Sequence, residues 1–211
     1  MEKLLLEDFT KYKFLSNIKF SPNGANIGFI CHQINLESYN YLSDIYIINK
    51  AKELIFRLTS LNEEKSFVWQ NSNTIVFPSF QSNEDRARAE EGEMFTPFYR
   101  ISIDDGEASK FFEIPMAVDN IEFINDNILV LEGIYNPELD NISNSMGNKN
   151  IYSKFRKDKD YRILDEIPFW SNNQGFTNKV RKRLYLYNIA KDTLMAITDE
   201  FTNINTYKLN N

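Results

Sequence analysis

The chain contains one cysteine and one histidine, Cys31 and His32, two side chains that often serve as nucleophile, general base or metal ligand. They follow directly on the strand-like residues 27–30, and successive side chains of a strand point to opposite faces. Two such ligands cannot form a zinc site, so we expect no metal. We interpret Cys31 as a small buried hydrophobe and His32 as a structural or surface residue, and a chain that can form no internal disulfide fits a reducing cytoplasm.

The glycines argue against two further kinds of site. A serine hydrolase presents its nucleophile on the sharp turn Gly-x-Ser-x-Gly, because small residues let the backbone approach closely. Only Gly24 and Gly28 have this spacing, and Asn26 stands between them. The sequence also has no Gly-x-Gly-x-x-Gly motif and no phosphate-binding loop. We therefore expect no catalytic residue in this chain and no cofactor.

The charge of the chain argues against two classes of partner. Its 24 Lys and Arg residues stand against 30 Asp and Glu, which gives a formal net charge of −6. Such a chain has no basic field for nucleic acid or for an anionic membrane surface. No apolar run approaches the length of a membrane span. We expect an intracellular protein that binds neither nucleic acid nor membrane.

The elements that must position any site are repeated along the chain. Residues 45–59 align without a gap on residues 184–198. In both copies apolar and aromatic residues alternate into the polar turn Asn-x-Ala-Lys and out again, which is typical of two strands with one buried face. A unit that recurs in this way usually stacks against copies of itself.

Each of these hairpins follows another predicted hairpin, so a complete unit has four antiparallel strands. The spacing of the units is that of β-propeller blades. We predict an all-β partial propeller, with an insertion of loop or short helix in its third blade and a long polar loop at residues 81–93. The predicted bounds are about 16–60 for the first blade, 64–115 for the second, 118–199 for the third with its insertion at 136–178, and 203–211 for the start of a fourth.

An array of three and a half blades leaves apolar faces uncovered, because each blade of a propeller is normally covered by the next. Two explanations remain open. The chain is the N-terminal part of a longer protein, or it forms a homodimer through the exposed blade faces.

The chain resembles the N-terminal propeller of the prolyl oligopeptidase superfamily, with the acylaminoacyl-peptidase branch as the closest. The resemblance covers nearly the whole chain from about Asp8. It depends on three groups of residues: 20–24 before 27–29, 43–46 followed by 57–59, and 165–170 with 175–176 before 183–186.

In that family a propeller of usually seven blades precedes a C-terminal α/β-hydrolase domain, and the two enclose a cavity that limits entry to peptides. The resemblance implies that this chain is a non-catalytic, substrate-gating segment of a cytoplasmic serine peptidase that acts on short peptides. It implies peptidase activity in the parent protein and none in the chain itself.

The resemblance also suggests two groups of substrate-binding residues. Acidic residues on a propeller loop of related peptidases can hold the amino terminus of a peptide, and Glu90 with Glu91 could do so here. The alternative is a solvated loop or a short helix with ion pairs between its side chains. A second group combines aromatic residues and carboxylates that could line a peptide-admitting channel, although such aromatic residues are more often core: Asp165, Glu166, Phe169 and Trp170.

Two other functions stay open at this stage. The chain could be a free-standing propeller-type module that presents its loops to a protein partner. It could also be a propeller glycosidase, which needs two carboxylates facing one another across a cavity. Spacing in the sequence cannot show such convergence.

Overall fold

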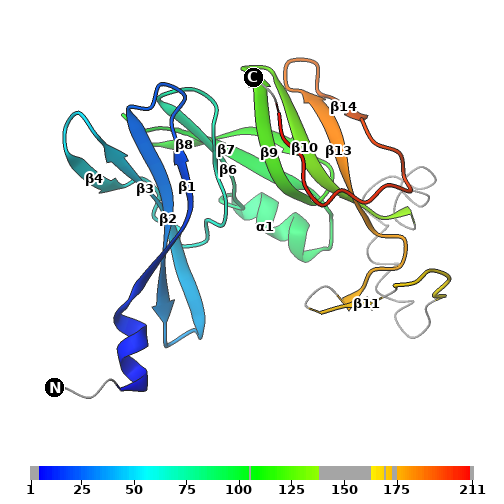
Figure 1. The fold of residues 1–211 in the computed structure, drawn as a ribbon, viewed down its shortest axis with the longest axis horizontal. Helices are drawn as coiled ribbons and strands as arrows, with labels where there is room; N and C mark the ends of the chain where they lie inside the picture. The colour runs from blue at the N-terminus through cyan, green and yellow to red at the C-terminus, as the bar shows by residue number, and fades with distance from the viewer. Residues whose placement is uncertain (1–4, 105, 138–162, 169, 173–174, 210–211) are drawn as a thin grey trace. The chain divides into compact units, whose positions relative to one another are not determined.

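The computed structural model describes residues 5–104, 106–137, 163–168, 170–172 and 175–209 (Figure 1). Within these residues, a 3₁₀ helix and an α-helix accompany fourteen strands. The elements are η1 (Leu6–Lys11), β1 (Lys13–Phe20), β2 (Asn26–Asn35), β3 (Asn40–Asn49), β4 (Leu54–Arg57), β5 (Val68–Trp69), β6 (Thr74–Pro78), α1 (Asn83–Glu90), β7 (Thr96–Ser102), β8 (Ala108–Ile114), β9 (Val118–Asn125), β10 (Ile128–Tyr135), β11 (Trp170–Ser171), β12 (Gly175–Phe176), β13 (Arg181–Asn188) and β14 (Thr193–Ala196).

Twelve of the strands form three four-stranded antiparallel sheets, in the orders β1-β2-β3-β4, β5-β6-β7-β8 and β9-β10-β13-β14. The short hairpin β11-β12 lies between β10 and β13 in the chain and forms its own two-stranded sheet. Consecutive four-stranded sheets of this kind are the blades of a propeller. The chain is therefore an all-β partial propeller, as its sequence predicts.

The chain divides into two compact units. The first unit contains residues 1–79 and 97–112, and the second contains residues 80–96 and 113–211. None of the described helices has the length and hydropathy needed to cross a bilayer.

The core of the first unit lies on one face of the sheet β1–β4. Ile30, Ile45 and Ile47 are fully buried there against Phe67 and Trp69. Gly28 of β2 allows this close approach, because a Cβ atom at its position would lie 2.8 Å from the ring of Phe67. The Trp69 indole N–H also donates a hydrogen bond of 3.2 Å to the carbonyl oxygen of Lys19.

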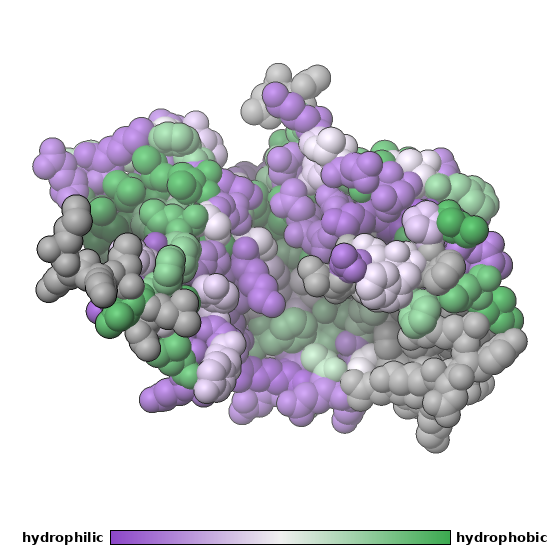
Figure 2. Space-filling view, turned by 60° about the horizontal axis from the view of Figure 1, so that its bottom comes forward, coloured by the Kyte–Doolittle hydropathy of each residue, from purple (hydrophilic) through white to green (hydrophobic). Residues whose placement is uncertain are grey.

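The opposite face of the same sheet is apolar but open to solvent. Leu15, Ile18 and Phe20 of β1 and Ile55 of β4 are all more than half exposed. Figure 2 shows apolar side chains gathered over this sheet, on the left of the view. We call this surface, defined by Leu15, Ile18, Phe20 and Ile55, the outer face of the first sheet.

The internal repeat of the sequence is reproduced in hydrogen bonds. At the turn of the hairpin β3-β4, the Asn49 side chain accepts from the Lys52 backbone N–H at 2.9 Å, and Asn188 accepts from Lys191 at 3.0 Å in β13-β14. Each turn ends on an acidic residue with positive φ, 51° at Glu53 and 49° at Asp192. The two hairpins therefore share one turn geometry.

The repeat extends beyond the turn to a threonine after the last strand. The Thr59 hydroxyl accepts from the Ile45 backbone N–H at 3.0 Å, and the Thr198 hydroxyl accepts from Leu184 at 3.2 Å. The backbone N–H groups of the preceding residues, Leu58 and Ile197, donate hydrogen bonds of 2.8 Å to the carbonyl oxygens of Ile45 and Leu184, respectively. Each threonine thus continues the pairing where β4 or β14 has ended.

Two segments differ in detail from the sequence-based expectation. The polar stretch 81–93, expected to be a long loop, contains α1, which agrees with the alternative of a short helix with ion pairs; the Ser82 hydroxyl caps it by accepting from the Asp85 backbone N–H at 3.0 Å. Residues 203–209 form no strand of their own. Instead, Asn203 and Ile204 make hydrogen bonds of 2.9 Å to the backbone of Lys182 at the start of β13.

Candidate functional site

His32 lies on β2 between two serine hydroxyls. One ring nitrogen is 2.6 Å from the Ser16 hydroxyl of β1, and the other is 2.7 Å from the Ser43 hydroxyl of β3. The imidazole thus connects the side chains of three adjacent strands, which is a structural role. The described residues contain no cluster of histidine, cysteine and carboxylate side chains that could hold a metal ion.

The acidic residues Glu90 and Glu91 lie at the C-terminal end of α1, and both are exposed. The ion pairs of this segment centre on Arg88, one turn earlier. Its guanidinium lies 2.7 Å from Glu93 and 2.8 Å from Glu113 of β8, and 3.9 Å above the ring of Phe95. These two carboxylates raise the pKa of Arg88. Arg88 therefore fixes α1 to β8 as a structural element.

The carboxylates of Asp165 and Glu166 fix the residues that follow β12. Asp165 forms an ion pair with Lys179, and Glu166 forms one with Arg181 of β13. These partners are the main cause of the lowered pKa of both carboxylates. Glu166 also accepts a hydrogen bond of 2.8 Å from the Lys179 backbone N–H.

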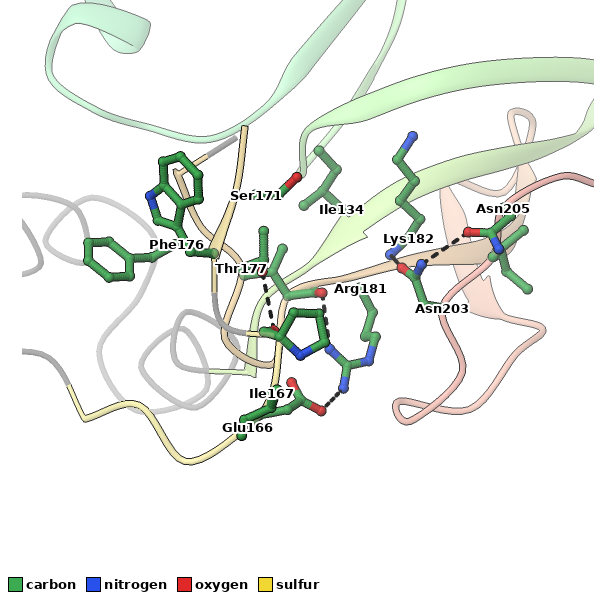
Figure 3. A pocket seen from close by; sticks show the side chains of 14 residues that line it. Ile134, Glu166, Ile167, Ser171, Phe176, Thr177, Arg181, Lys182, Asn203 and Asn205 are labelled. Atoms are coloured by element: carbon green, nitrogen blue, oxygen red, sulfur yellow. Dashed lines mark hydrogen bonds and ion pairs between the residues drawn. The ribbon is translucent and has the colours of Figure 1, made fainter. Parts of the chain in front are cut away.

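A pocket of about 880 Å³ opens beside these ion pairs, entirely within the second unit (Figure 3). We call it the β13 pocket. Its walls come from residues 166–168, the hairpin β11-β12, residues 180–182 at the start of β13, residues 203–205, and Ile134 of β10. Figure 3 shows the Glu166 carboxylate joined to the Arg181 guanidinium at the base of the view.

The structure brings part of the second predicted group to this pocket. Glu166 and Trp170 line it, and Asp165 is the residue next to Glu166. Phe169 lies outside the described residues, as does most of the predicted insertion 136–178. Glu90 and Glu91 do not line the pocket.

Sequence reasoning did not single out the pocket residues contributed by β13 and by the segment after β14. Lys182 lies in a strand in which apolar and polar residues alternate, so its sequence context gives no sign of a site. In the structure its ammonium lies 2.6 Å from Asp119 and 3.0 Å from Glu132. Asn203 and Ile204 meet it only because the chain turns back along β13. The aromatic and acidic residues at 165–170 were the only sequence signal.

Comparison with known proteins gives matches only at the level of three-dimensional structure. No protein-family model matches the chain, and no curated protein sequence matches it either. The fold, however, is shared with several solved peptidase structures.

Acylaminoacyl peptidases are among these neighbours. The enzyme from Pyrococcus horikoshii superposes with a TM-score of 0.61 and 17% identity, over 89% of this chain and 25% of that one. An acylaminoacyl peptidase in complex with Z-Gly-Gly-Phe-chloromethyl ketone gives a TM-score of 0.62 and 18% identity, over 91% and 25%. The AtxE2 isopeptidase with astexin3-dC4 bound gives 0.51 and 11%, over 86% and 28%.

These comparisons show that the chain shares its fold with part of several solved peptidase structures. Identities this low show the fold alone, and the chain spans about a quarter of the length of the proteins it matches. The sequence-based resemblance to the N-terminal propeller region of the acylaminoacyl peptidases is confirmed at that level.

Proposed function

We propose that the chain is the non-catalytic, substrate-gating propeller segment of a cytoplasmic serine peptidase that acts on short peptides. The observation that carries the proposal is the superposition on acylaminoacyl peptidases over 91% of this chain but only 25% of theirs. The sequence supports it, because it holds no Gly-x-Ser-x-Gly motif and its only histidine is held between serine hydroxyls.

In this proposal a C-terminal α/β-hydrolase domain carries the catalytic residues, and the propeller narrows the route by which peptides reach them. Two surfaces of the chain are candidates for contact with the peptide. The β13 pocket offers Glu166 and Trp170. The end of α1 offers Glu90 and Glu91, whose exposed carboxylates could bind a peptide ammonium group through charge-assisted hydrogen bonds.

The coding sequence after the codon for Asn211 is the first test. The proposal expects the remaining blades and then a Gly-x-Ser-x-Gly motif. A stop codon at that point, with no hydrolase subunit that copurifies with the chain, would contradict it.

A fluorophosphonate label, which reacts with activated serines, is the second test. The full-length protein should be labelled and should cleave short peptides, whereas the 211-residue chain should do neither. The matched control is a full-length variant with its elbow serine replaced by alanine. Labelling of the isolated chain would show that the proposed division of roles is wrong.

The outer face of the first sheet favours a second candidate function, a free-standing interaction module or a homodimer. Four large apolar side chains on one sheet are more than half exposed there, and such a patch often marks an interface. Light scattering on the purified chain tests this: a dimer or larger species would favour it, and a monomer that binds no hydrophobic dye would count against it.

A further inference from the structure

The charged side chains that line the β13 pocket are already compensated. Glu166 is paired with Arg181, and the Lys182 ammonium is shared between Asp119 and Glu132. The carboxylates of Asp119 and Glu132 are also the main cause of the raised pKa of Lys182. A charged ligand would have to compete with the partner that each of these groups already has. The lining therefore favours a neutral ligand.

Three large apolar side chains that line the same pocket are exposed to solvent. Ile167 is 89% exposed, Trp170 is 53% exposed and Phe176 is 46% exposed. Single exposed apolar residues are common, but three of them around one concavity indicate a surface that is covered in use. A ligand with bulky apolar groups would bury them.

Polar contacts hold the segment that carries these residues in position without a ligand. The Asn178 amide donates hydrogen bonds of 3.2 Å to the Ile163 carbonyl and to the Asp165 carboxylate. Glu166 ties residues 165–168 to the Lys179 backbone N–H, and Thr177 donates to the Pro168 carbonyl at 3.5 Å. A pocket fixed in advance loses less conformational entropy when it binds.

Neutral hydrogen-bonding groups lie between the apolar walls. Asn205, which lines the pocket, accepts a hydrogen bond of 3.4 Å from the Asn203 amide, and its own amide nitrogen carries two N–H donors. Within the described residues, the Arg181 guanidinium bonds Glu166 and the Val180 carbonyl, and it has further N–H donors. Apolar walls with amide and guanidinium donors between them suit a peptide, whose side chains are apolar and whose carbonyls accept.

We propose that the β13 pocket binds a neutral stretch of extended peptide through one or two bulky apolar side chains, with Asn205 and Arg181 donating to its backbone carbonyls. The cavity of about 880 Å³ lies within the size range of ligand sites. This inference rests on the proposed function for the kind of ligand. It adds the chemistry of the side chains that the site selects.

The test uses the full 211-residue chain and the blocked peptide N-acetyl-Leu-Phe-Leu-amide. Trp170 reports on the pocket because it is half exposed, whereas Trp69 is buried in the core of the first unit. Binding should shift the tryptophan emission to shorter wavelength, and Trp170→Phe should abolish that shift. Titration calorimetry gives the dissociation constant independently of the fluorophore.

Matched variants and peptides locate the binding site and its chemistry. Ile167→Ser should weaken binding about fivefold or more, since it removes most of an apolar contact. Ile197→Ser, at an equally apolar exposed position outside the pocket lining, should leave binding unchanged. N-acetyl-Ser-Asn-Ser-amide and Leu-Phe-Leu with free, charged ends should bind at least about tenfold more weakly.

Three results would overturn the inference: no binding of the blocked apolar peptide, equal binding by Ile167→Ser, or equal binding of the polar or charged peptide. Failure here is distinct from failure of the proposed function. A hydrolase domain downstream with no peptide binding by this chain would refute only the inference. Peptide binding without any hydrolase partner would refute only the proposed function.

Discussion

Glu64 places a buried carboxyl group in the connection between the first two sheets. It is 1% exposed; one oxygen accepts from the Glu63 backbone N–H at 3.2 Å, and the other has no hydrogen-bond partner among the described residues. Burial raises its pKa, and the nearby charge of Asp44 adds to the increase. The pKa of Glu64 is therefore higher in the folded than in the unfolded chain.

We predict that Glu64→Gln stabilises the protein at neutral pH, by on the order of 1 kcal/mol. Because the folded-state pKa is raised, the wild type loses stability as the pH rises from the ordinary value of 4.5 through the folded-state pKa. The glutamine variant has no such titration and should lack this decrease. Urea denaturation at several pH values measures the free energy of unfolding of both proteins. If that free energy changes with pH in the same way in both, Glu64 does not cause the decrease.

Gly28 is the second residue whose effect can be stated. A methyl group there would overlap the ring of Phe67 at 2.8 Å. We predict that Gly28→Ala lowers the free energy of unfolding by about 1–3 kcal/mol, the usual cost of overpacking. The double variant Gly28→Ala with Phe67→Leu should recover part of what the two single variants lose, since the smaller side chain makes room. Strict additivity would argue against this contact.

At the scale of elements, the two copies of the repeated hairpin provide an internal comparison. Thr59 accepts from the N–H of fully buried Ile45, whereas Thr198 accepts from Leu184, which is only partly buried. We predict that Thr59→Val costs about 1–3 kcal/mol, because a buried N–H loses its acceptor. Thr198→Val should cost clearly less, since water can replace the hydroxyl. Thermal or urea unfolding of both variants decides it, and equal costs would contradict the argument.

The elements also show what the sequence could predict. Alternating residues and the Asn-x-Ala-Lys turns indicated the strands of both hairpins correctly, because those patterns are local. The helix α1 has no apolar face to reveal it; its buried residue is Asp85, and Arg88 fixes it through Glu113 of another strand. Only part of the β13 pocket could be predicted from the sequence, because some of its residues come together through the tertiary fold. Glu166 and Trp170 stood out locally, but Lys182 and Asn203 come together through the tertiary fold.

At the scale of the whole molecule, we expect any self-association to involve the outer face of the first sheet. We predict that Ile18→Ser with Phe20→Ser reduces self-association and hydrophobic-dye binding of the purified chain, with little loss of stability, because both side chains are about 60% exposed. Light scattering and dye fluorescence measure this. The control is Leu36→Ser with Tyr39→Ser at the β2-β3 turn, which removes exposed apolar side chains elsewhere. If both double variants behave alike, the outer face has no special role.

The residues that form the core of the first unit are all synthesised early. All residues that build it, together with those packed against it, lie between Ile30 and Ala108, so a nascent chain holds the complete set when little more than half of its 211 residues have been made. The strand that bears Leu15, Ile18 and Phe20 is synthesised even earlier. This apolar surface is therefore exposed to water before the core residues of the first unit have all been made.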